Sequence, residues 1–329
     1  MGNEIFSESQ TSILYDITFN LSILSCIGSG FICLSSLISS RLRTFAYSLI
    51  LALALSNIGV DASFLYGTTT DSNSIECFVQ GVSHVYFALV GFFVTTAITT
   101  TCYRMVVKQD FTRNDRIFPV MCICWGVPLP LSFLPLITNN YGEAGVWCSI
   151  VSQFEENVDF WGLFWSITIL YIPLWFTVGL NIWMHFAVSK SLHRLERAAS
   201  SHSEQAGLVK GQSRFLGVIV RLRLYPLVLC ICWSWASVNK IYEIVSPSSP
   251  QFWLYILQYT FQSLNGVLFA LIYVITPSVR AEWKRKLNLL DETLKRTKLS
   301  VLVRKKVKAN DGDAQENEQL LAGTARLVQ

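Results

Sequence analysis

Seven long apolar stretches, separated by short polar segments, dominate the pattern of residues along this chain. A helix needs about 20 apolar residues to cross the hydrocarbon core of a bilayer, which is roughly 30 Å thick. The spans must be helical because backbone polar groups find no water partners inside a membrane. The pattern predicts spans at Ile13–Leu37, Phe45–Tyr66, Phe78–Tyr103, Ile117–Ile137, Phe160–Val188, Leu224–Val245 and Phe252–Ile275.

The basic residues are distributed unevenly among the polar segments. All of the 26 Lys and Arg residues except Lys240 follow the first, third, fifth or seventh span. Basic loops remain on the cytosolic side of a membrane, so the N-terminus is placed outside and the C-terminus in the cytosol. The predicted fold class is an all-α membrane protein, a bundle of seven transmembrane helices, followed by a cytosolic amphipathic helix.

The segment after the seventh span carries that amphipathic helix. Val279, Trp283, Leu287 and Leu290 recur at helical spacing among basic residues, as in a helix that lies on the anionic inner leaflet. An ordinary basic stretch beside the membrane is the alternative. The predicted regions are an extracellular N-terminus (1–12), a seven-span domain (13–276), the amphipathic helix (277–298) and a polar, disordered cytosolic tail (299–329).

Composition and cysteine placement exclude several functions. Only 15% of the residues are charged and the net charge is +4, which gives no support for a nucleic-acid partner. Metal-ligand spacings, phosphate-binding glycine loops and a nucleophile elbow are lacking, so the sequence predicts neither an enzyme nor a bound metal or cofactor. Of the nine cysteines, Cys77 and Cys148 face the outer, oxidising side, where a disulfide between them is favoured over two free thiols.

Several segments, taken in order, resemble the cyclic-AMP-receptor-like family of G-protein-coupled receptors, found in slime moulds and plants. The resemblance runs from about residue 20 to about residue 290. The segments that carry it are RLRTFAYSLILALALSN, VTTAITTTCYRMVVK, GVWCSI, RLYPLVLCICWSWASVNKIYEIVSP and FWLYILQ…GVLFALIYVITPSVR.

This resemblance implies a receptor that binds a ligand in an outer cavity and activates a heterotrimeric G protein. The inner ends of the fifth and sixth helices would move outward to admit the G protein. The resemblance also implies the Cys77–Cys148 disulfide and makes Trp125 the packing tryptophan of the fourth helix. The implied partners are an unidentified extracellular ligand, a heterotrimeric G protein and the lipid bilayer, with the chain located in the plasma membrane as a multi-pass protein.

Four residues are candidates for the coupling face. Arg104, preceded by Tyr103, lies at the cytosolic end of the third span, where helices three, five and six would meet. An arginine there can pair in a closed state and be released on opening, while a simple interfacial anchor is the alternative. Arg221 and Arg223 are candidates for the same surface, or belong only to the basic cytosolic charge.

Some positions depart from the family pattern or bend helices. Asn57 stands where related receptors usually have Asp, and Phe269 where they tend to have Asn. These departures put an ion-holding polar centre in doubt, although Asn265 could replace part of the polar contact. Pro173 and Pro226 predict kinks in the fifth and sixth spans, which suit either moving helices or static packing.

The ligand cavity is expected to be lined by the outer halves of helices three, five, six and seven, with the second outer loop as its cover. The outer loops are acidic, and Lys240 is the only lysine or arginine predicted on the outer side. A neutral or cationic ligand is therefore favoured over cyclic AMP, whose phosphate would need a cation. A transporter or channel, or a seven-helix scaffold without coupling, are the alternatives. The candidate lining residues, for which aromatic core packing is the other explanation, are His84, Tyr86, Trp165, Tyr242, Glu243 and Tyr259.

Overall fold

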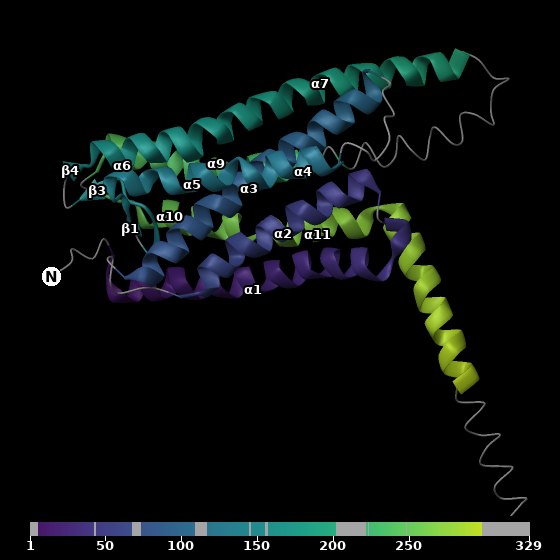
Figure 1. The fold of residues 1–329 in the computed structure, drawn as a ribbon, viewed down its shortest axis with the longest axis horizontal. Coiled ribbons are helices and arrows are strands. Elements are labelled where there is room, and N and C mark those ends of the chain that lie inside the picture. Colours follow the sequence, from purple (N-terminus) through teal and green to yellow (C-terminus); the bar gives the residue numbers. More distant parts are fainter. Residues whose placement is uncertain are drawn as a thin grey trace, which may run out of the picture. The chain divides into compact units, whose positions relative to one another are not determined.

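The computed structural model divides the chain into two compact units, residues 1–276 and residues 277–329. In the second unit the described part is one helix, Pro277–Thr297. The predictions for Arg221, Arg223 and the tail 299–329 concern residues outside the described part of the chain. The structure describes residues 6–42, 44–67, 74–108, 117–144, 146–154, 157–201, 222, 224–247 and 249–297 (Figure 1).

The first three predicted spans form unbroken helices: α1 (Glu8–Ile38), α2 (Phe45–Leu65) and α3 (Ile75–Val106), with a short turn η1 (Ser40–Leu42) between the first two. Each starts at a polar residue in extended conformation. Ser7 and Gln10 form a reciprocal capping box at the start of α1, and the Ser74 hydroxyl accepts from the backbone N–H of Cys77 at the start of α3. These caps satisfy amides that would otherwise lack partners.

The sixth span is the single helix α9 (Leu224–Val245), and the other three spans are built from consecutive helical segments. Proline accounts for two of the breaks, because it lacks the N–H that a continuous helix requires. Pro128 opens α5 directly after α4, and Pro173 follows the π-helical stretch η4. The segments are α4 (Ile117–Gly126), α5 (Pro128–Phe133), η3 (Leu134–Thr138), α6 (Phe160–Trp165), η4 (Ser166–Tyr171), α7 (Ile172–Ser201), α10 (Phe252–Ser263) and α11 (Asn265–Ile275).

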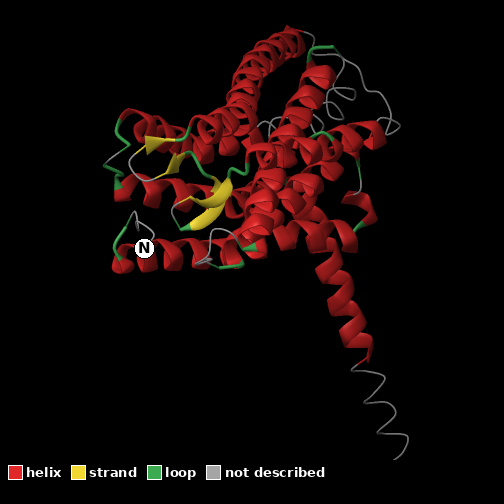
Figure 2. Cartoon of the chain, turned by 60° about the vertical axis from the view of Figure 1, so that its left-hand side comes forward, coloured by secondary structure: helices red, strands yellow, loops and turns green. Residues whose placement is uncertain are grey.

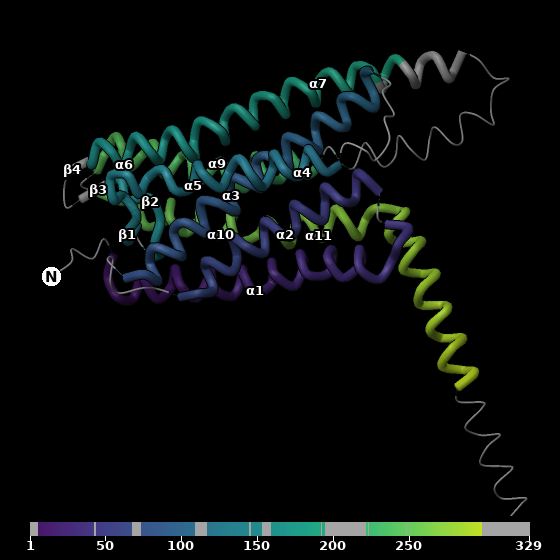
Figure 3. Tube along the Cα trace, in the orientation of Figure 1, coloured from purple at the N-terminus to yellow at the C-terminus, as the bar shows by residue number. Residues whose placement is uncertain are grey.

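These helices confirm the predicted membrane fold. The described residues contain six helices long and apolar enough to cross a membrane, and seven when the broken span that includes Phe252–Ile275 is counted. In the first unit α3 is the central helix, in contact with α2, α4, α7 and α9 (Figure 3). Helix α1 packs against α2, α10 and α11.

Short strands, which the sequence analysis did not predict, form the second outer loop. Strands β1 (Tyr141–Ala144) and β2 (Trp147–Ile150) pair antiparallel, as do β3 (Gln153–Phe154) and β4 (Asn157–Val158). Figure 2 shows the strands at the end of the bundle where α1 begins. By the distribution of basic residues this is the outer end, so we call the β1–β2 hairpin the lid.

A cluster of buried polar side chains joins α1, α2 and α11 in the middle of the bundle. The Asn57 amide donates to Ser25 Oγ at 2.9 Å, to Ser29 Oγ at 3.2 Å and to Asp61 Oδ2 at 2.8 Å. The backbone N–H of Gly266, at the start of α11, donates to Ser25 Oγ at 3.1 Å. The polar partners of Asn57 therefore come largely from serines of α1, which the sequence analysis had not considered.

Phe269 and Asn265 lie on the other side of this junction. The Phe269 ring packs 5.6 Å from the ring of Tyr225 on α9, and both side chains are almost fully buried. Asn265 is also buried, and its side-chain oxygen has no hydrogen-bond partner among the described residues. An aromatic pair thus links α9 to α11 at the position where the family pattern would place an asparagine.

Candidate functional site

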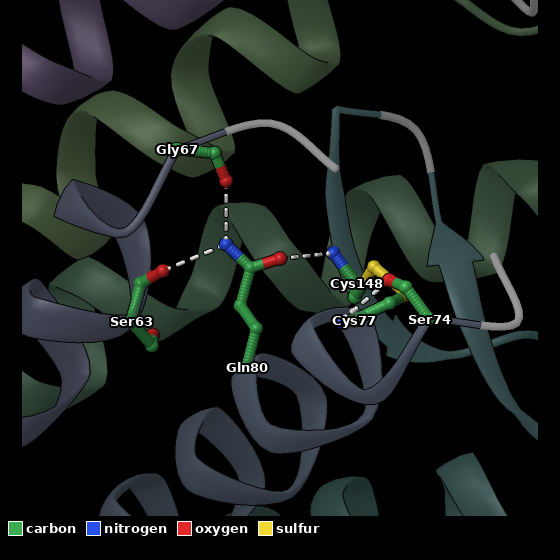
Figure 4. Close-up of a disulfide and its surroundings, with 6 residues drawn as sticks. All are labelled: Ser63, Gly67, Ser74, Cys77, Gln80 and Cys148. Carbon is green, nitrogen blue, oxygen red and sulfur yellow. Dashed lines mark hydrogen bonds between the residues drawn. A yellow bond between two sulfur atoms is a disulfide. The ribbon is translucent and has the colours of Figure 1, made fainter. Parts of the chain in front are cut away.

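A disulfide between Cys77 of α3 and Cys148 of β2 holds the lid against the bundle, which confirms the predicted bond. The neighbouring side chain of Gln80 strengthens this attachment (Figure 4). Its Nε2 donates to the carbonyls of Ser63 and Gly67, each at 2.8 Å, and its Oε1 accepts from the backbone N–H of Cys148 at 2.9 Å. Gln80 therefore ties α2, α3 and the lid together.

The lid also buries an aromatic side chain in the bundle. Trp147 is only 3% exposed, and its Nε1 donates to the Phe64 carbonyl at 3.2 Å. Its ring lies 4.6 Å from the ring of Tyr259 and 5.3 Å from that of Phe64. Because Tyr259 belongs to α10 and Phe64 to α2, the lid contacts two of the helices that bound the space that it covers.

Beneath the lid lies a cavity of about 110 Å³. It is bounded by α2, α3, the lid, η4, α9 and α10. The second, third, fifth, sixth and seventh spans therefore all contribute to its wall. Gln262, which is 3% exposed, has a side-chain oxygen without a hydrogen-bond partner among the described residues. Polar and charged residues of the lining, apart from the tyrosines, are Ser63, Gln80, His84, Glu143, Ser149, Ser152, Ser166, Lys240, Glu243, Gln258 and Gln262.

An ion pair within α9 supplies the strongest charges of the cavity. Lys240 Nζ lies 2.7 Å from Glu243 Oε2, and the two side chains are 15% and 13% exposed. Lys240 also donates to Ser152 Oγ at 2.7 Å, which connects α9 to the segment after the lid. Glu243 Oε1 accepts from Tyr255 OH at 2.7 Å and from Asn239 Nδ2 at 3.0 Å. The network thus joins α9, α10 and the outer loop.

Three of the sequence-predicted ligand residues line this cavity: His84, Glu243 and Tyr259. His84 Nδ1 lies 3.3 Å from Ser63 Oγ, between α3 and α2. The hydroxyl of Tyr259 donates to the Ala144 carbonyl at 3.5 Å, at the end of β1. The cavity therefore brings together residues from helices two, three, six and seven of the sequence-predicted bundle.

The other three candidates are not among the lining residues. Tyr86 OH donates to the Trp125 carbonyl at 3.2 Å, so these two residues connect α3 to α4. Trp165 Nε1 donates to Thr138 Oγ1 at 2.7 Å and connects α6 to η3. Tyr242 is half-buried, next to Glu243 but outside the lining.

The first turn of the fifth span packs closely against the outer loop at Gly162. Asp159 Oδ2 accepts from the backbone N–H of Gly162 at 2.6 Å and from Asn140 Nδ2 at 2.6 Å. A Cβ atom built at Gly162 would lie 1.7 Å from the backbone oxygen of Val151. A side chain at this position would therefore displace the loop backbone.

We expect Gly162→Ala to lower the free energy of unfolding by about 1–3 kcal/mol, as overpacking of a core does. The matched control is Gly179→Ala in α7, where a Cβ meets nothing within 4 Å. That change should be neutral or stabilising, since alanine favours a helix by about 1 kcal/mol over glycine. Thermal unfolding of the detergent-solubilised protein compares the two. Equal melting temperatures would contradict the close fit.

The cytosolic half of α3 borders two further cavities on different faces of the helix. Arg104 lines a groove of about 340 Å³ with residues of α2, α4 and α7. Thr99 and Cys102 line a second cavity of about 160 Å³ between α3, α7 and α9, to which Asn181 and His185 also contribute. Arg104 thus borders the fourth and fifth spans, while the cavity beside the sixth span is lined by other residues of α3.

Tyr103 and Pro226 lie near this end, and Pro173 lies farther along the groove. The ring of Tyr103 lies 5.5 Å from the ring of Trp183, which connects α3 to α7. Pro226, three residues into α9, lines the cavity between α3, α7 and α9. Pro173 lies in the lining of the groove that contains Arg104.

The bundle, its outer cavity and its disulfide-held lid define a seven-helix membrane protein with a covered outer cavity. The fold matches a crystal structure of squid rhodopsin with a TM-score of 0.69, over 87% of this chain and 88% of the other, at 15% sequence identity. Residues 7–284 match the family model described as slime mold cyclic AMP receptor. The chain belongs to this family.

Individual relatives are consistent with that assignment. The chain is 29% identical to G-protein coupled receptor 1 of Arabidopsis thaliana over 278 residues, which cover 84% of this chain and 82% of that protein. It is 26% identical to Cyclic AMP receptor-like protein A of Dictyostelium discoideum, over 82% of this chain and 66% of the relative. The family and the fold are those of multi-pass membrane receptors, not of enzymes.

Proposed function

We propose that this chain is a plasma-membrane receptor that binds an extracellular ligand beneath the lid and transmits the signal to a heterotrimeric G protein. The observation that supports this most is the outer cavity, whose charged network joins α9 to α10 and to the outer loop. A ligand that alters this network acts directly on the sixth span. The receptor family and the rhodopsin-like fold are consistent with such a role.

Helix α9 lines both the outer cavity and the cavity at the cytosolic end between α3, α7 and α9. Its outer end carries Lys240 and Glu243, and its inner end lines the cavity between α3, α7 and α9 with Pro226. Ligand binding would therefore shift a two-state equilibrium in which the inner ends of α7 and α9 separate from α3. Coupling between two such sites is typically worth about 1–3 kcal/mol.

The cavity favours a neutral or cationic ligand. Lys240, the one lysine or arginine among the described lining residues, is engaged by Glu243 and Ser152, while Glu143 adds a second carboxylate to the lining. A cyclic nucleotide would require a cation for its phosphate, which here means breaking the Lys240–Glu243 pair. The unpartnered oxygen of Gln262 favours a ligand that donates a hydrogen bond.

We place Arg104 and Tyr103 at the coupling face because they lie at the cytosolic end of α3. A G protein that inserts between α3, α7 and α9 would pass this end of the helix. Arg221 and Arg223, which precede α9, belong to the same proposal by their position in the sequence.

The test is capture of G-protein heterotrimers from nucleotide-depleted membranes, with guanine nucleotide added to release the complex. We expect nucleotide-sensitive capture by the full chain and a loss of about tenfold or more in Arg104→Ala, since removing one charged contact costs about 1.5–3 kcal/mol. Lys108→Ala, at an exposed lysine one turn later, should retain most of the capture. Solute flux in liposomes together with no capture by any heterotrimer would favour a transporter instead.

A further inference from the structure

One face of α3 forms the floor of the groove that contains Arg104. The floor residues follow one another at spacings of three and one, which places them on a single side of a helix. Helix α4 and helix α7 form the walls, and Phe45 of α2 also contributes to the lining. The lining residues are Phe45, Phe93, Thr96, Ala97, Thr100, Thr101, Arg104, Met105, Val120, Ile123, Cys124, Pro173, Phe176 and Thr177.

The groove opens sideways, toward the lipid. Ile123 and Phe176 stand on its walls and are 55% and 68% exposed. The hydroxyls of Thr96 and Thr101 donate to backbone carbonyls one turn earlier, at 3.0 and 2.7 Å. Since these hydroxyls are satisfied within the helix, the surface offered to the bilayer is largely apolar. Among the described residues that line the groove, Arg104 is the one that carries a charge.

The length of the groove matches one leaflet of the membrane. Arg104 lies 11 residues after Phe93 on α3, which corresponds to about 16 Å along a helix. Half of the hydrocarbon core is about 15 Å thick. Because Arg104 lies at the cytosolic end, the groove extends from the middle of the bilayer to the level of the inner headgroups.

The groove is also large enough to hold part of an acyl chain, since its volume of about 340 Å³ is many times the roughly 10–15 Å³ that one water needs. A membrane offers acyl chains at every lateral opening. What distinguishes this groove is that its apolar length ends at a guanidinium.

We propose that the groove binds an anionic phospholipid of the inner leaflet, with one acyl chain along α3 and the headgroup phosphate on Arg104. A planar guanidinium binds phosphate in bidentate fashion, and its five N–H donors allow other partners at the same time. The cytosolic leaflet is the one rich in anionic lipids. This site does not depend on the proposed coupling to a G protein.

The test uses the full chain in nanodiscs of phosphatidylcholine mixed with phosphatidylserine, one of which carries a photoactivatable acyl chain. Crosslinked peptides are mapped by mass spectrometry. With labelled phosphatidylserine we expect crosslinks on the groove-lining residues of α3 and α7, and fewer with labelled phosphatidylcholine. Arg104→Gln should lower the phosphatidylserine labelling about tenfold, as expected for loss of a charge-assisted contact, and should lower labelling by phosphatidylcholine less, because the choline cation of that lipid offsets the charge of its phosphate.

Matched variants separate the groove from general effects. Ala97→Phe fills the groove and should remove labelling by both lipids, while Ala62→Phe, at an exposed alanine of α2, should leave it intact. Lys108→Gln removes a nearby exposed cation outside the groove lining and should retain the phosphatidylserine preference. Equal labelling by the two lipids, or a preference that survives in Arg104→Gln, would overturn the proposal. Should Arg104→Gln fail to fold, the loss of labelling in Ala97→Phe remains a required result.

Discussion

Replacing both Cys77 and Cys148 with serine is expected to lower the free energy of unfolding by about 2–4 kcal/mol. The two residues are separated by 71 positions, and closing a loop of that length in a fully unfolded chain corresponds to about 4 kcal/mol. The third and fourth spans remain inserted when a membrane protein loses its tertiary structure. The chain is therefore already constrained, and the figure from loop length is an upper bound.

Thermal unfolding in detergent measures this effect, with an expected decrease in melting temperature of roughly 2–4 °C per kcal/mol. Cys122→Ser, at an exposed free cysteine of α4, is the control and should unfold like the parent chain. A membrane-permeant reductant should lower the melting temperature of the parent but leave the double variant unchanged. If reductant affects both proteins equally, the stabilisation does not come from this disulfide.

The membrane fold could be predicted from the sequence because each span is determined by a local run of apolar residues, and that feature recurs along the chain. Each span needs only a run of apolar residues, and the basic loops add direction. The breaks at Pro128 and Pro173 also follow from local chemistry. By contrast, the β1–β2 hairpin has no strong pattern in the sequence, and it depends on contacts that only the bundle supplies, such as Trp147 against Tyr259.

The hydrogen-bond partners of Asn57 could not be predicted from the family pattern alone. A comparison by position directs attention to Phe269 and Asn265 in the seventh span. The observed partners of Asn57 are instead Ser25 and Ser29, at the spacing that small polar residues take on the interface of a membrane helix. Reading α1 for buried serines at helical spacing could have identified them.

The sequence predicted that the cavity lies in the outer half of the bundle, but it identified only some of the residues that line it. Tyr86 and Trp165 are aromatic residues in the outer halves of spans, as His84 and Tyr259 are, and composition cannot distinguish their directions. Direction depends on how each helix is rotated in the bundle, and rotation is set by packing against neighbours. A structural role for Gln80 could have been predicted from the sequence, because a polar side chain one turn after Cys77 needs hydrogen-bond partners if it is buried.

Glu243→Gln is expected to lower the free energy of unfolding by about 2–3 kcal/mol, because Lys240 is then left without its carboxylate. Removing one member of a buried ion pair costs about 3–5 kcal/mol, and the partial exposure of these two side chains reduces that figure. Glutamine keeps an oxygen in place of the Oε1 that accepts from Tyr255 and Asn239. The loss therefore reports the ion pair and not the neighbouring hydrogen bonds.

The double variant Lys240→Met/Glu243→Gln makes this prediction specific. It removes both charges, so we expect its stability to return to within about 1 kcal/mol of the parent, as replacement of a buried pair by uncharged residues often allows. Lys240→Met alone should cost about 1–2 kcal/mol, since Glu243 keeps two donors. Thermal unfolding of the four proteins gives the coupling between the two positions. Simply additive losses would show that Lys240 and Glu243 stabilise the outer end of α9 independently, and a ligand would then not need to act on the pair to move the helix.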